Sequence, residues 1–486
     1  MRWKGGVALA AAAVGAPLML APGAPALAQT LGTKSATGYQ AADAAPATEP
    51  LPTITDDEGR TLILHGLNTA NSSKGDSGLP WIDRDDVVRE AREEGTNSVR
   101  YLILWRNVEP KPGQYDDAYL DEVAKRVAWY REQGMHVILD MHQDIYGPDA
   151  CQGAGDGAPA WATITDGQSC TPQDPWVLTY LQPGVLRAFD NFWNNTGKHP
   201  ELIRRYAAMW QHVAKRFAKD PAVLGYDLMN EPFGGTRHFG FFEGPILTPF
   251  YQRVVNAIRK VDRDSWLFIE PEALGANQGA ETSIGAVKDP RRGTPHIVLS
   301  PHFYPGGVDL GGSYEGVTKL LVQAQIALWR RNMPAAARRL KTPMWLGEVG
   351  GMGQDAPGAA EFTEAWLSMA DDLGIGWAYW SNDQRPAGVI DEKGSPTIFA
   401  GLLARPYARA IAGTPTKLSY ASNTLTVSWR NKSGVTGPTE IWFPSTPKVA
   451  STDPAGKWKS VWDAKRHVLS VWADPGTATH TLTVTP

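Results

Sequence analysis

The stretch GYDLMNEPFGG, residues 225–235, determines how the rest of the chain is interpreted. An apolar run ends in Asn230 and Glu231, a proline follows, and a glycine pair then loosens the backbone. The run has the length and character of a buried strand. A carboxylate at the end of such a strand is costly unless another group pairs with it or uses it. We therefore expect a partner for Glu231 elsewhere in the chain.

Eight short apolar runs alternate with amphipathic helical patterns from about residue 60 onward. Apolar on both faces, the runs are typical of parallel strands covered by helices. Eight strand–helix units in succession predict an α/β fold, a closed (β/α)8 TIM barrel. No glycine-rich dinucleotide fingerprint follows the first run, which disfavours an open Rossmann sheet. The predicted strands are 61–68, 97–105, 136–144, 223–232, 266–274, 297–305, 344–351 and 375–383.

The pattern changes after Gly413, where apolar and polar residues alternate between Asn, Gly, Asp and Pro turns. This predicts antiparallel strands in a small C-terminal β-sandwich. The other end of the chain has a basic start at Arg2 and Lys4, an apolar stretch and a small-residue cleavage site after Ala28. We predict a signal peptide at 1–28, a poorly ordered segment at 29–50, the barrel at 51–411 and the sandwich at 412–486.

Composition limits the possible partners. The 486 residues carry a formal net charge of −4, which argues against a phosphate-binding surface and hence against nucleic acid. Nineteen tryptophans offer flat apolar faces with a polar edge, which suit sugar rings. The signal-like start of the chain predicts that the protein is secreted and extracellular, and we expect a monomer.

Two cysteines, Cys151 and Cys170, lie in a connection of more than fifty residues after the third strand. In a secreted chain such a pair predicts one disulfide bond, with a free thiol nucleophile or a metal site as the weaker alternatives. Connections of this length are usually functional, and in a barrel this one would lie at the active-site face.

Glu348, in the run MWLGEVGG, is the expected partner of Glu231. The fourth and seventh strands of a barrel lie across its mouth from each other, so the two carboxylates would converge. Two carboxylates about 5 Å apart on either side of a glycosidic bond are what retaining glycoside hydrolysis requires. One would attack the anomeric carbon, and the other would protonate the leaving oxygen and then activate water.

Further polar and aromatic residues fall at the same level of the predicted barrel. Arg100 could keep a carboxylate ionised, Tyr304 could hydrogen-bond the nucleophile, and Trp380 could form the floor under a sugar. Asn230 could bind the sugar 2-hydroxyl. The remaining candidates at this level are His142, Asp144 and His302.

Each candidate also has a structural alternative. Arg100 could simply pair with a structural acid, and the two histidines could be satisfied structural residues. His65, His142 and His302 could also mimic a metallohydrolase site. We disfavour that reading because the first strand has no His-x-His pair and the two glutamates would lack a role. We expect no metal and no cofactor.

The motifs LMNEP, HFY, LGEVG and YWSND resemble those of glycoside hydrolase family 5. Within it, the stretches GLNTANSSKG, LDMHQDIYG, DGAPAWAT and YDLMNEPFGG resemble the actinobacterial endoglycoceramidases, over nearly the whole chain after residue 28. Such enzymes release the intact oligosaccharide from a glycosphingolipid and leave ceramide. The resemblance implies Glu231 as acid/base and Glu348 as nucleophile. It implies sugar-subsite residues at Lys74, His142, Asp144, Trp176, Asn230, Tyr304 and Trp380.

Three functions remain open at this stage: an endoglycoceramidase, a family 5 endo-β-glucanase acting on polysaccharide, and a non-catalytic glycan- or lipid-binding protein. The first would take a glycosphingolipid substrate at a transient membrane or micelle surface. An amphiphilic substrate needs a polar cleft for the sugars and an apolar channel for the ceramide. We predict that the stretch FGGTRHFGFFEGP, with Phe233, Phe239, Phe241 and Phe242, forms part of that channel wall.

Overall fold

The structure, a computed structural model, describes residues 51–309 and 311–486. The predicted signal peptide and the whole predicted poorly ordered segment lie outside the described residues.

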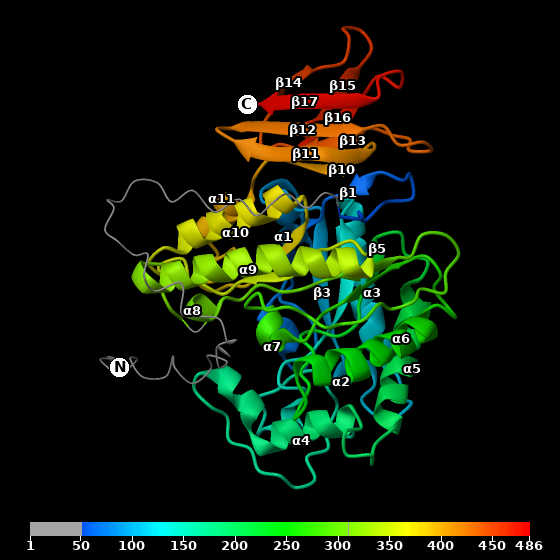
Figure 1. Cartoon of the computed structure of the whole chain (residues 1–486), viewed down its shortest axis with the longest axis vertical. Coiled ribbons are helices and arrows are strands. Elements are labelled where there is room, and N and C mark those ends of the chain that lie inside the picture. Colours follow the sequence, from blue (N-terminus) through cyan, green and yellow to red (C-terminus); the bar gives the residue numbers. More distant parts are fainter. Residues whose placement is uncertain (1–50, 310) are drawn as a thin grey trace, which may run out of the picture. The chain divides into compact units, whose positions relative to one another are not determined.

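Eight parallel strands form the predicted barrel (Figure 1). Their order is β7-β6-β5-β4-β3-β2-β9-β8, and parallel bridges Leu299–Met344 and Phe303–Val349 connect β7 to β8. The backbone amide of Trp345 also donates to the carbonyl of Leu299 at 3.0 Å, so the sheet joins onto itself. The TIM-barrel prediction is confirmed. The strands are β2 (His65–Asn68), β3 (Ser98–Leu104), β4 (His136–His142), β5 (Val223–Asp227), β6 (Trp266–Ile269), β7 (Ile297–Leu299), β8 (Leu346–Gly350) and β9 (Trp377–Trp380).

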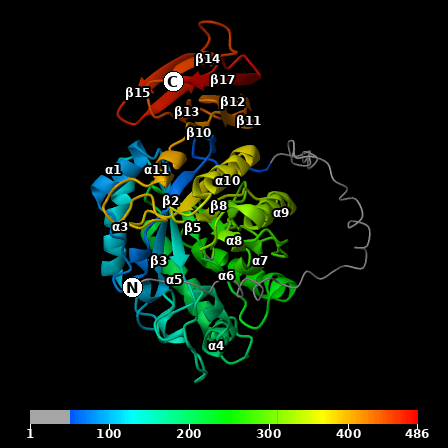
Figure 2. The ribbon, with the colours of Figure 1, turned by 90° about the vertical axis from the view of Figure 1, so that its left-hand side faces the viewer.

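Helices cover the outside of this sheet (Figures 1 and 2). Their ends follow the local sequence: Asp83 and Asp86 form a capping box at the start of α1, and Asp116 caps α3. The longer helices are α1 (Arg84–Arg92), α3 (Asp117–Glu132), α4 (Pro183–Phe192), α5 (Glu201–Phe217), α6 (Thr248–Ile258), α9 (Gly316–Leu340), α10 (Ala359–Leu373) and α11 (Ile398–Leu403). The short ones are α2 (Trp105–Val108), α7 (Ala273–Ala276), α8 (Gly306–Asp309), η1 (Asn71–Lys74), η2 (Pro148–Ala150), η3 (Trp176–Leu181), η4 (Phe239–Phe241) and η5 (Glu243–Leu247).

The connection from β6 to β7 departs from the regular alternation, because it contains only the short α7. Residues 277–296 are rich in Gly, Pro and polar side chains, which disfavours a helix. Side chains of α9 hold this segment in place of helical packing. Asn332 Nδ2 donates to the carbonyl of Gly279 at 2.8 Å, and Arg339 donates to the carbonyl of Ile284 at 2.7 Å.

The first predicted strand, 61–68, is divided between two sheets. Residues His65–Asn68 form β2 of the barrel, whereas β1 (Thr61–Leu62) pairs antiparallel with β10 (Tyr407–Ile411). Ile63 between them packs into the C-terminal core, and Leu64 packs under the barrel strands. One continuous apolar run therefore supplies two cores, which its periodicity alone does not reveal.

The C-terminal strands form two antiparallel sheets, ordered β1-β10-β13-β16-β15 and β11-β12-β17-β14. Inward-facing residues of both, such as Val427, Trp429 and Trp442, share one core, which confirms the predicted sandwich. The strands not yet given are β11 (Thr414–Ala421), β12 (Thr424–Arg430), β13 (Thr439–Trp442), β14 (Lys448–Ser451), β15 (Lys459–Asp463), β16 (Val468–Trp472) and β17 (Thr479–Thr485).

Candidate active site

Glu231 and Glu348 meet at the carboxyl-end face of the barrel. Glu348 lies within β8, and Glu231 follows β5 by four residues. A carboxylate oxygen of each and a ring nitrogen of His302 all lie within 4.8 Å of one another. The separation suits a carboxylate pair that forms a covalent glycosyl intermediate, and it leaves less room than an inverting pair needs for a water molecule.

Glu231 adopts a left-handed backbone conformation, with φ of 42°. This conformation is unfavourable for a side chain other than glycine and is common at functional sites. Two neighbours hold it: the amide of Glu231 donates to Glu270 Oε2 at 2.8 Å, and Gln143 Nε2 donates to its carbonyl at 2.9 Å. The strained turn places the carboxylate at the mouth of the site, with 14% of the side chain exposed.

Two donors contact the Glu231 carboxylate: His302 Nδ1 at 3.0 Å and Asn277 Nδ2 at 2.7 Å. Burial raises the pKa of Glu231 above its usual range; the hydrogen bond and charge of His302 oppose the rise, and the charge of Glu348 adds to it. A carboxyl group with a raised pKa is suited to act as a general acid.

Hydrogen-bond donors surround the Glu348 carboxylate. Arg100 donates to its Oε1 at 2.6 Å, and the Tyr304 hydroxyl donates to its Oε2 at 2.9 Å. His302 Nδ1 lies 3.7 Å from Oε2. Burial disfavours the charged form of His302, yet the carboxylates of Glu270 and Glu348 outweigh it and raise the His302 pKa well above its usual range. Glu348 therefore lies beside two positive charges and a phenol, an arrangement suited to a nucleophilic carboxylate.

Arg100 is fully buried at the centre of this network. It contacts four carboxylates, so both interpretations from the sequence hold: it pairs with structural acids and with Glu348. Their distances to Arg100 are 2.9 Å for Asp140, Asp227 and Glu270, and 2.6 Å for Glu348.

A second polar cluster contains Lys74, His142 and Asp144. The ammonium group of Lys74 pairs with Asp144 and lies 4.4 Å from the centre of the Trp380 ring, and the His142 ring stacks against Trp380 at 5.4 Å. Burial and the charge of Lys74 disfavour His142 in its charged form, but Asp140 dominates with Asp144 and raises its pKa to about 9. Charged donors and acceptors beside an aromatic face are the features of a sugar-binding subsite.

Trp176 does not belong to this polar cluster. It lies on η3 with 46% of its surface exposed, beside Tyr180 at 6.1 Å. Asn230 is buried, and its side chain accepts from Arg100 and donates to the carbonyl of Gln143. One amide hydrogen of Asn230 is left for a substrate hydroxyl.

Cys151 and Cys170 form the predicted disulfide bond. The bond joins two positions within the long β4–α4 connection, which also carries Trp176. A covalent link in this connection restricts the backbone beside the site.

The predicted channel wall is partly wrong. Phe242 and Phe233 are buried core residues, and the Phe242 ring packs against Trp193 at 5.0 Å. Phe239 and Phe241 are exposed, at 47% and 81%. The cause is the turn of η4, which sends successive rings in opposite directions.

Several residues of the network were missed in the sequence. Glu270 follows β6 directly and Asn68 is the last residue of β2, so the rule that identified Glu231 applies to both. Asn277 and Asp156 lie in irregular connections and carry no such signal. All four contact a residue of the site: Glu270 and Asn68 contact Arg100, Asn277 contacts Glu231, and Asp156 accepts from the Asp144 amide.

Three carboxylate-rich groups have the spacing of metal ligands. The group of Asp140, Asp227 and Glu270 surrounds the guanidinium of Arg100, which supplies the positive charge. The group of His142, Asp144 and Asp156 is paired in the same way with Lys74. The third group is Glu231, His302 and Glu348 itself, where the pKa of the histidine favours a proton over a metal.

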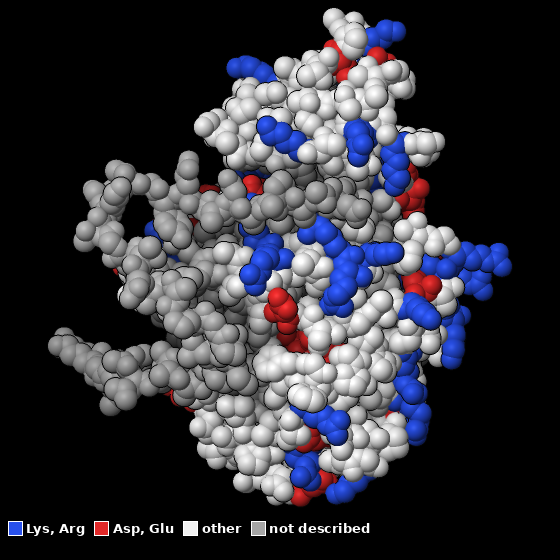
Figure 3. All heavy atoms as spheres, in the orientation of Figure 1, with Lys and Arg blue, Asp and Glu red and all other residues white. Residues whose placement is uncertain are grey.

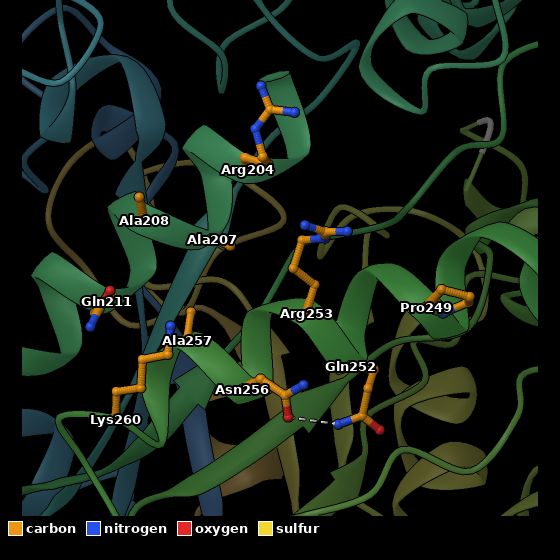
Figure 4. A pocket seen from close by; sticks show the side chains of 10 residues that line it. All are labelled: Arg204, Ala207, Ala208, Gln211, Pro249, Gln252, Arg253, Asn256, Ala257 and Lys260. Carbon is orange, nitrogen blue, oxygen red and sulfur yellow. Dashed lines mark hydrogen bonds between the residues drawn. The ribbon is translucent and has the colours of Figure 1, made fainter. Parts of the chain in front are cut away.

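A groove of about 480 Å³ lies elsewhere, between α5 and α6 (Figure 4). Arg204, Arg253 and Lys260 line it together with small and amide side chains. None of the residues described above lines this groove, so it is separate from the candidate active site.

Fold and site together define a glycoside hydrolase. The chain belongs to glycoside hydrolase family 5, because the profile described as Cellulase (glycosyl hydrolase family 5) matches residues 55–386. The profile of the glycoside hydrolase family 5 C-terminal domain matches residues 405–484. The family expected from the sequence is confirmed.

Individual relatives are similar over most of their length. Endoglycoceramidase I of Rhodococcus hoagii (strain 103S) is 29% identical over 408 residues, which are 80% of this chain and 78% of that protein. The ganglioside GM3 complex of endo-glycoceramidase II from Rhodococcus sp. is 43% identical, with a TM-score of 0.86 over 90% of this chain and 99% of that one. The lactosyl-enzyme intermediate of the same enzyme is 44% identical, with a TM-score of 0.83 over 89% of this chain and 99% of that one.

Proposed function

We propose that this chain is a retaining endoglycosidase that hydrolyses the β-linkage between the oligosaccharide and the ceramide of glycosphingolipids. The observation that carries the proposal is the approach of the Glu231 and Glu348 carboxylates to within 4.8 Å in the surroundings of an acid and of a nucleophile. The similarity to endoglycoceramidases over most of the chain supports the substrate class.

The first step forms a covalent intermediate. A Glu348 oxygen attacks the anomeric carbon, the bond to the ceramide oxygen breaks, and Glu231 gives its proton to that oxygen. Ceramide leaves as the free alcohol, and the oligosaccharide remains as an ester of Glu348. Arg100 and Tyr304 hold the attacking carboxylate in place through the two hydrogen bonds described above.

The second step returns the enzyme to its starting state. Glu231, now ionised, takes a proton from water as the water oxygen attacks the anomeric carbon and the ester bond breaks. Esterification removes the negative charge of Glu348, which is one of the causes of the raised pKa of Glu231. The pKa of Glu231 therefore falls in the intermediate, where a base is needed.

The subsite residues are proposed roles of the same kind. We propose that Lys74, His142, Asp144 and Trp380 bind the sugar next to the cleaved bond. Their charged groups gather at one indole face, and the charges of Lys74 and Asp144 interact with Glu348 and Glu231. Asn230 would bind the 2-hydroxyl, and Trp176 a more distant sugar.

We propose further that the chain is secreted, acts as a monomer and meets its substrate at a membrane or micelle surface. The signal-like start of the sequence and the Cys151–Cys170 disulfide support an extracellular location. Within residues 51–309 and 311–486, no helix combines the length and apolarity needed to cross a membrane.

A panel of purified glycosphingolipids tests the activity, with free glycan and ceramide both quantified and cellulose-type polysaccharides as the comparison. We expect glycan and ceramide in equal amounts from the lipids, and loss of turnover by at least about 10³-fold in Glu348→Gln. Hydrolysis of the polysaccharide alone would instead favour an endo-β-glucanase. Wild-type rates in Glu348→Gln would contradict the mechanism, and binding without hydrolysis would indicate a glycan- or lipid-binding protein.

A further inference from the structure

Exposed large hydrophobic side chains are concentrated on one part of the barrel. Among the described residues eleven such side chains are exposed, and nine lie on the segments that follow β4, β5, β6 and β7. Each of these segments starts at the carboxyl end of its strand, where the catalytic carboxylates lie. The nine are Trp176, Leu181, Phe239, Phe241, Leu274, Val317, Leu320, Leu321 and Leu328; the other two are Ile398 and Val461.

Helix α9 carries the largest share of this surface. Val317, Leu320 and Leu321 are 73%, 66% and 59% exposed, and with Ala324 and Leu328 they follow the spacing i, i+3, i+4, i+7 and i+11. That spacing forms one stripe, about 16 Å long, along the helix. The stripe does not serve the core, because α9 packs through another face, which includes Val322, Trp329 and Met333.

Leu328, at the end of the stripe, contacts the connection that contains α7. Gly279 lies against the backbone of Trp329 and the side chain of Leu328, and Figures 1 and 2 show α7 beside α9. In the same connection, Gly275 of α7 lies against the Phe239 ring. The same connection carries Asn277, which donates to Glu231. Packing contacts therefore connect the end of the α9 stripe, through α7, with Phe239 and with the segment that carries Asn277.

Basic residues follow the apolar stripe along the same helix. Arg330 and Arg331 are exposed within one turn after Leu328, where Arg330 pairs with Asp372 at 2.9 Å, and Arg338 and Arg339 lie near the end of α9. In Figure 3, Lys and Arg side chains gather in the middle of the face, over the end of α9 that lies to the right in Figure 1. An apolar stripe followed by basic residues along the same helix is typical of a helix that lies on a membrane surface.

We propose that Phe239, Phe241, Leu274 and the α9 stripe form a docking face that inserts shallowly into the outer surface of a lipid bilayer. The inference rests on the proposed function and adds the residues of this chain that contact the bilayer. A glycosphingolipid presents its sugars above the bilayer and its ceramide within it. An enzyme that rests on the bilayer by the rim of its active site can reach the bond between them without extracting the lipid into water.

The expected binding is reversible, because it depends on a small number of exposed apolar side chains and docking has its own entropy cost. Removing three of the side chains should therefore abolish most of it. The test variant is Val317→Ser/Leu320→Ser/Leu321→Ser, which changes exposed positions away from the catalytic contacts. The matched control is Val461→Ser, at a 56% exposed position on β15 of the sandwich.

The experiment uses residues 29–486 and has two readouts. The first is co-sedimentation with vesicles of phosphatidylcholine and phosphatidylserine that contain no glycosphingolipid. The second is turnover of a glycosphingolipid embedded in such vesicles, compared with turnover of a soluble aryl β-glycoside. We expect the triple variant to lose vesicle binding and vesicle turnover by about tenfold or more, with unchanged turnover of the soluble substrate and an unchanged melting temperature. Val461→Ser should match the wild type throughout.

The remaining outcomes separate the two proposals. Vesicle binding by the wild type without glycosphingolipid cleavage would sink the proposed function and leave the docking face standing. Cleavage with equal vesicle turnover in wild type and triple variant would overturn the docking face alone. A wild-type dimer that the triple variant converts to a monomer, measured by sedimentation velocity, would assign the face to a second copy of the chain and also overturn the proposal.

Discussion

Arg100 shows how a single buried residue sets the geometry of the site. Its guanidinium presents donors in a fixed fork, and three of its nitrogens reach four carboxylates and two Asn oxygens. Several acids buried together would be costly without such a cation. A lysine could supply the charge but not several N–H donors fixed in one plane. The orientation of the Glu348 carboxylate therefore depends on an arginine at this position.

The hydrogen bond from Asn277 to Glu231 leads to a prediction about pH. The proposed first step needs protonated Glu231, so kcat/KM should fall as the pH rises through the raised pKa of this residue. Asn277 donates to the carboxylate and so stabilises its ionised form. In Asn277→Ala the pKa of Glu231 should therefore rise further, and the alkaline limb of the pH profile should move upward by about 0.5–1 unit. The measurement is kcat/KM against pH with a soluble aryl β-glycoside.

Asn332→Ala is the matched control, because Asn332 fastens the same segment through the carbonyl of Gly279 without touching Glu231. It should leave the alkaline limb in place. Equal shifts in both variants would mean that the limb reports loosening of the segment and not the hydrogen bond.

At the scale of elements, the segment after β5 places two adjacent phenylalanines in opposite environments. Phe242 is fully buried against Trp193, and Phe241 is 81% exposed. Phe242→Ser should lower the free energy of unfolding by about 3–5 kcal/mol, because it removes a core ring and buries a hydroxyl group. Phe241→Ser should change it by less than about 0.5 kcal/mol. Urea denaturation followed by tryptophan fluorescence measures both, and a similar loss in the two variants would contradict this division.

The same segment shows what a sequence can and cannot predict about elements. Glu231 and Glu348 were predictable because a polar residue that ends an apolar run is unusual, and the barrel places such ends together. The burial of Phe242 was not predictable, because both phenylalanines have the same local pattern. Asn277 belongs to the same class: it lies in an irregular connection, and only the folded chain brings it to Glu231.

At the scale of the whole molecule, the run at 61–68 joins the barrel and the sandwich. Its first two residues pair with β10, and its last four form β2. The His65 ring in β2 stacks on Tyr407 of β10 at 3.8 Å, and the Tyr407 hydroxyl donates to the carbonyl of Gly95 at 2.9 Å. Strand periodicity predicted both the barrel and the sandwich. It could not show that residues 61–68 contribute to both, because this run has the same apolar pattern throughout, and only the strand pairing in the structure reveals the division.

Gly95 is the position at which this joint can be tested. It ends the turn after α1 with φ of 73°, and a Cβ atom there would stand 2.5 Å from the Trp442 ring of the sandwich core. Gly374 offers a matched comparison: it follows α10 with φ of 64°, but a Cβ atom there would meet only Leu418, at 3.8 Å. Alanine costs about 1 kcal/mol at either position because of the left-handed backbone.

Gly95→Ala adds a clash with a buried indole that cannot move without disturbing the sandwich core. We therefore expect Gly95→Ala to lower the free energy of unfolding by about 2 kcal/mol more than Gly374→Ala. Because residues 61–68 belong to both the barrel and the sandwich, the wild type should unfold in urea as one unit, with coincident fluorescence and circular-dichroism transitions. In Gly95→Ala these two transitions should occur at different urea concentrations. Equal destabilisation by the two substitutions would mean that Trp442 yields freely and that the sandwich contributes little to the stability of the barrel.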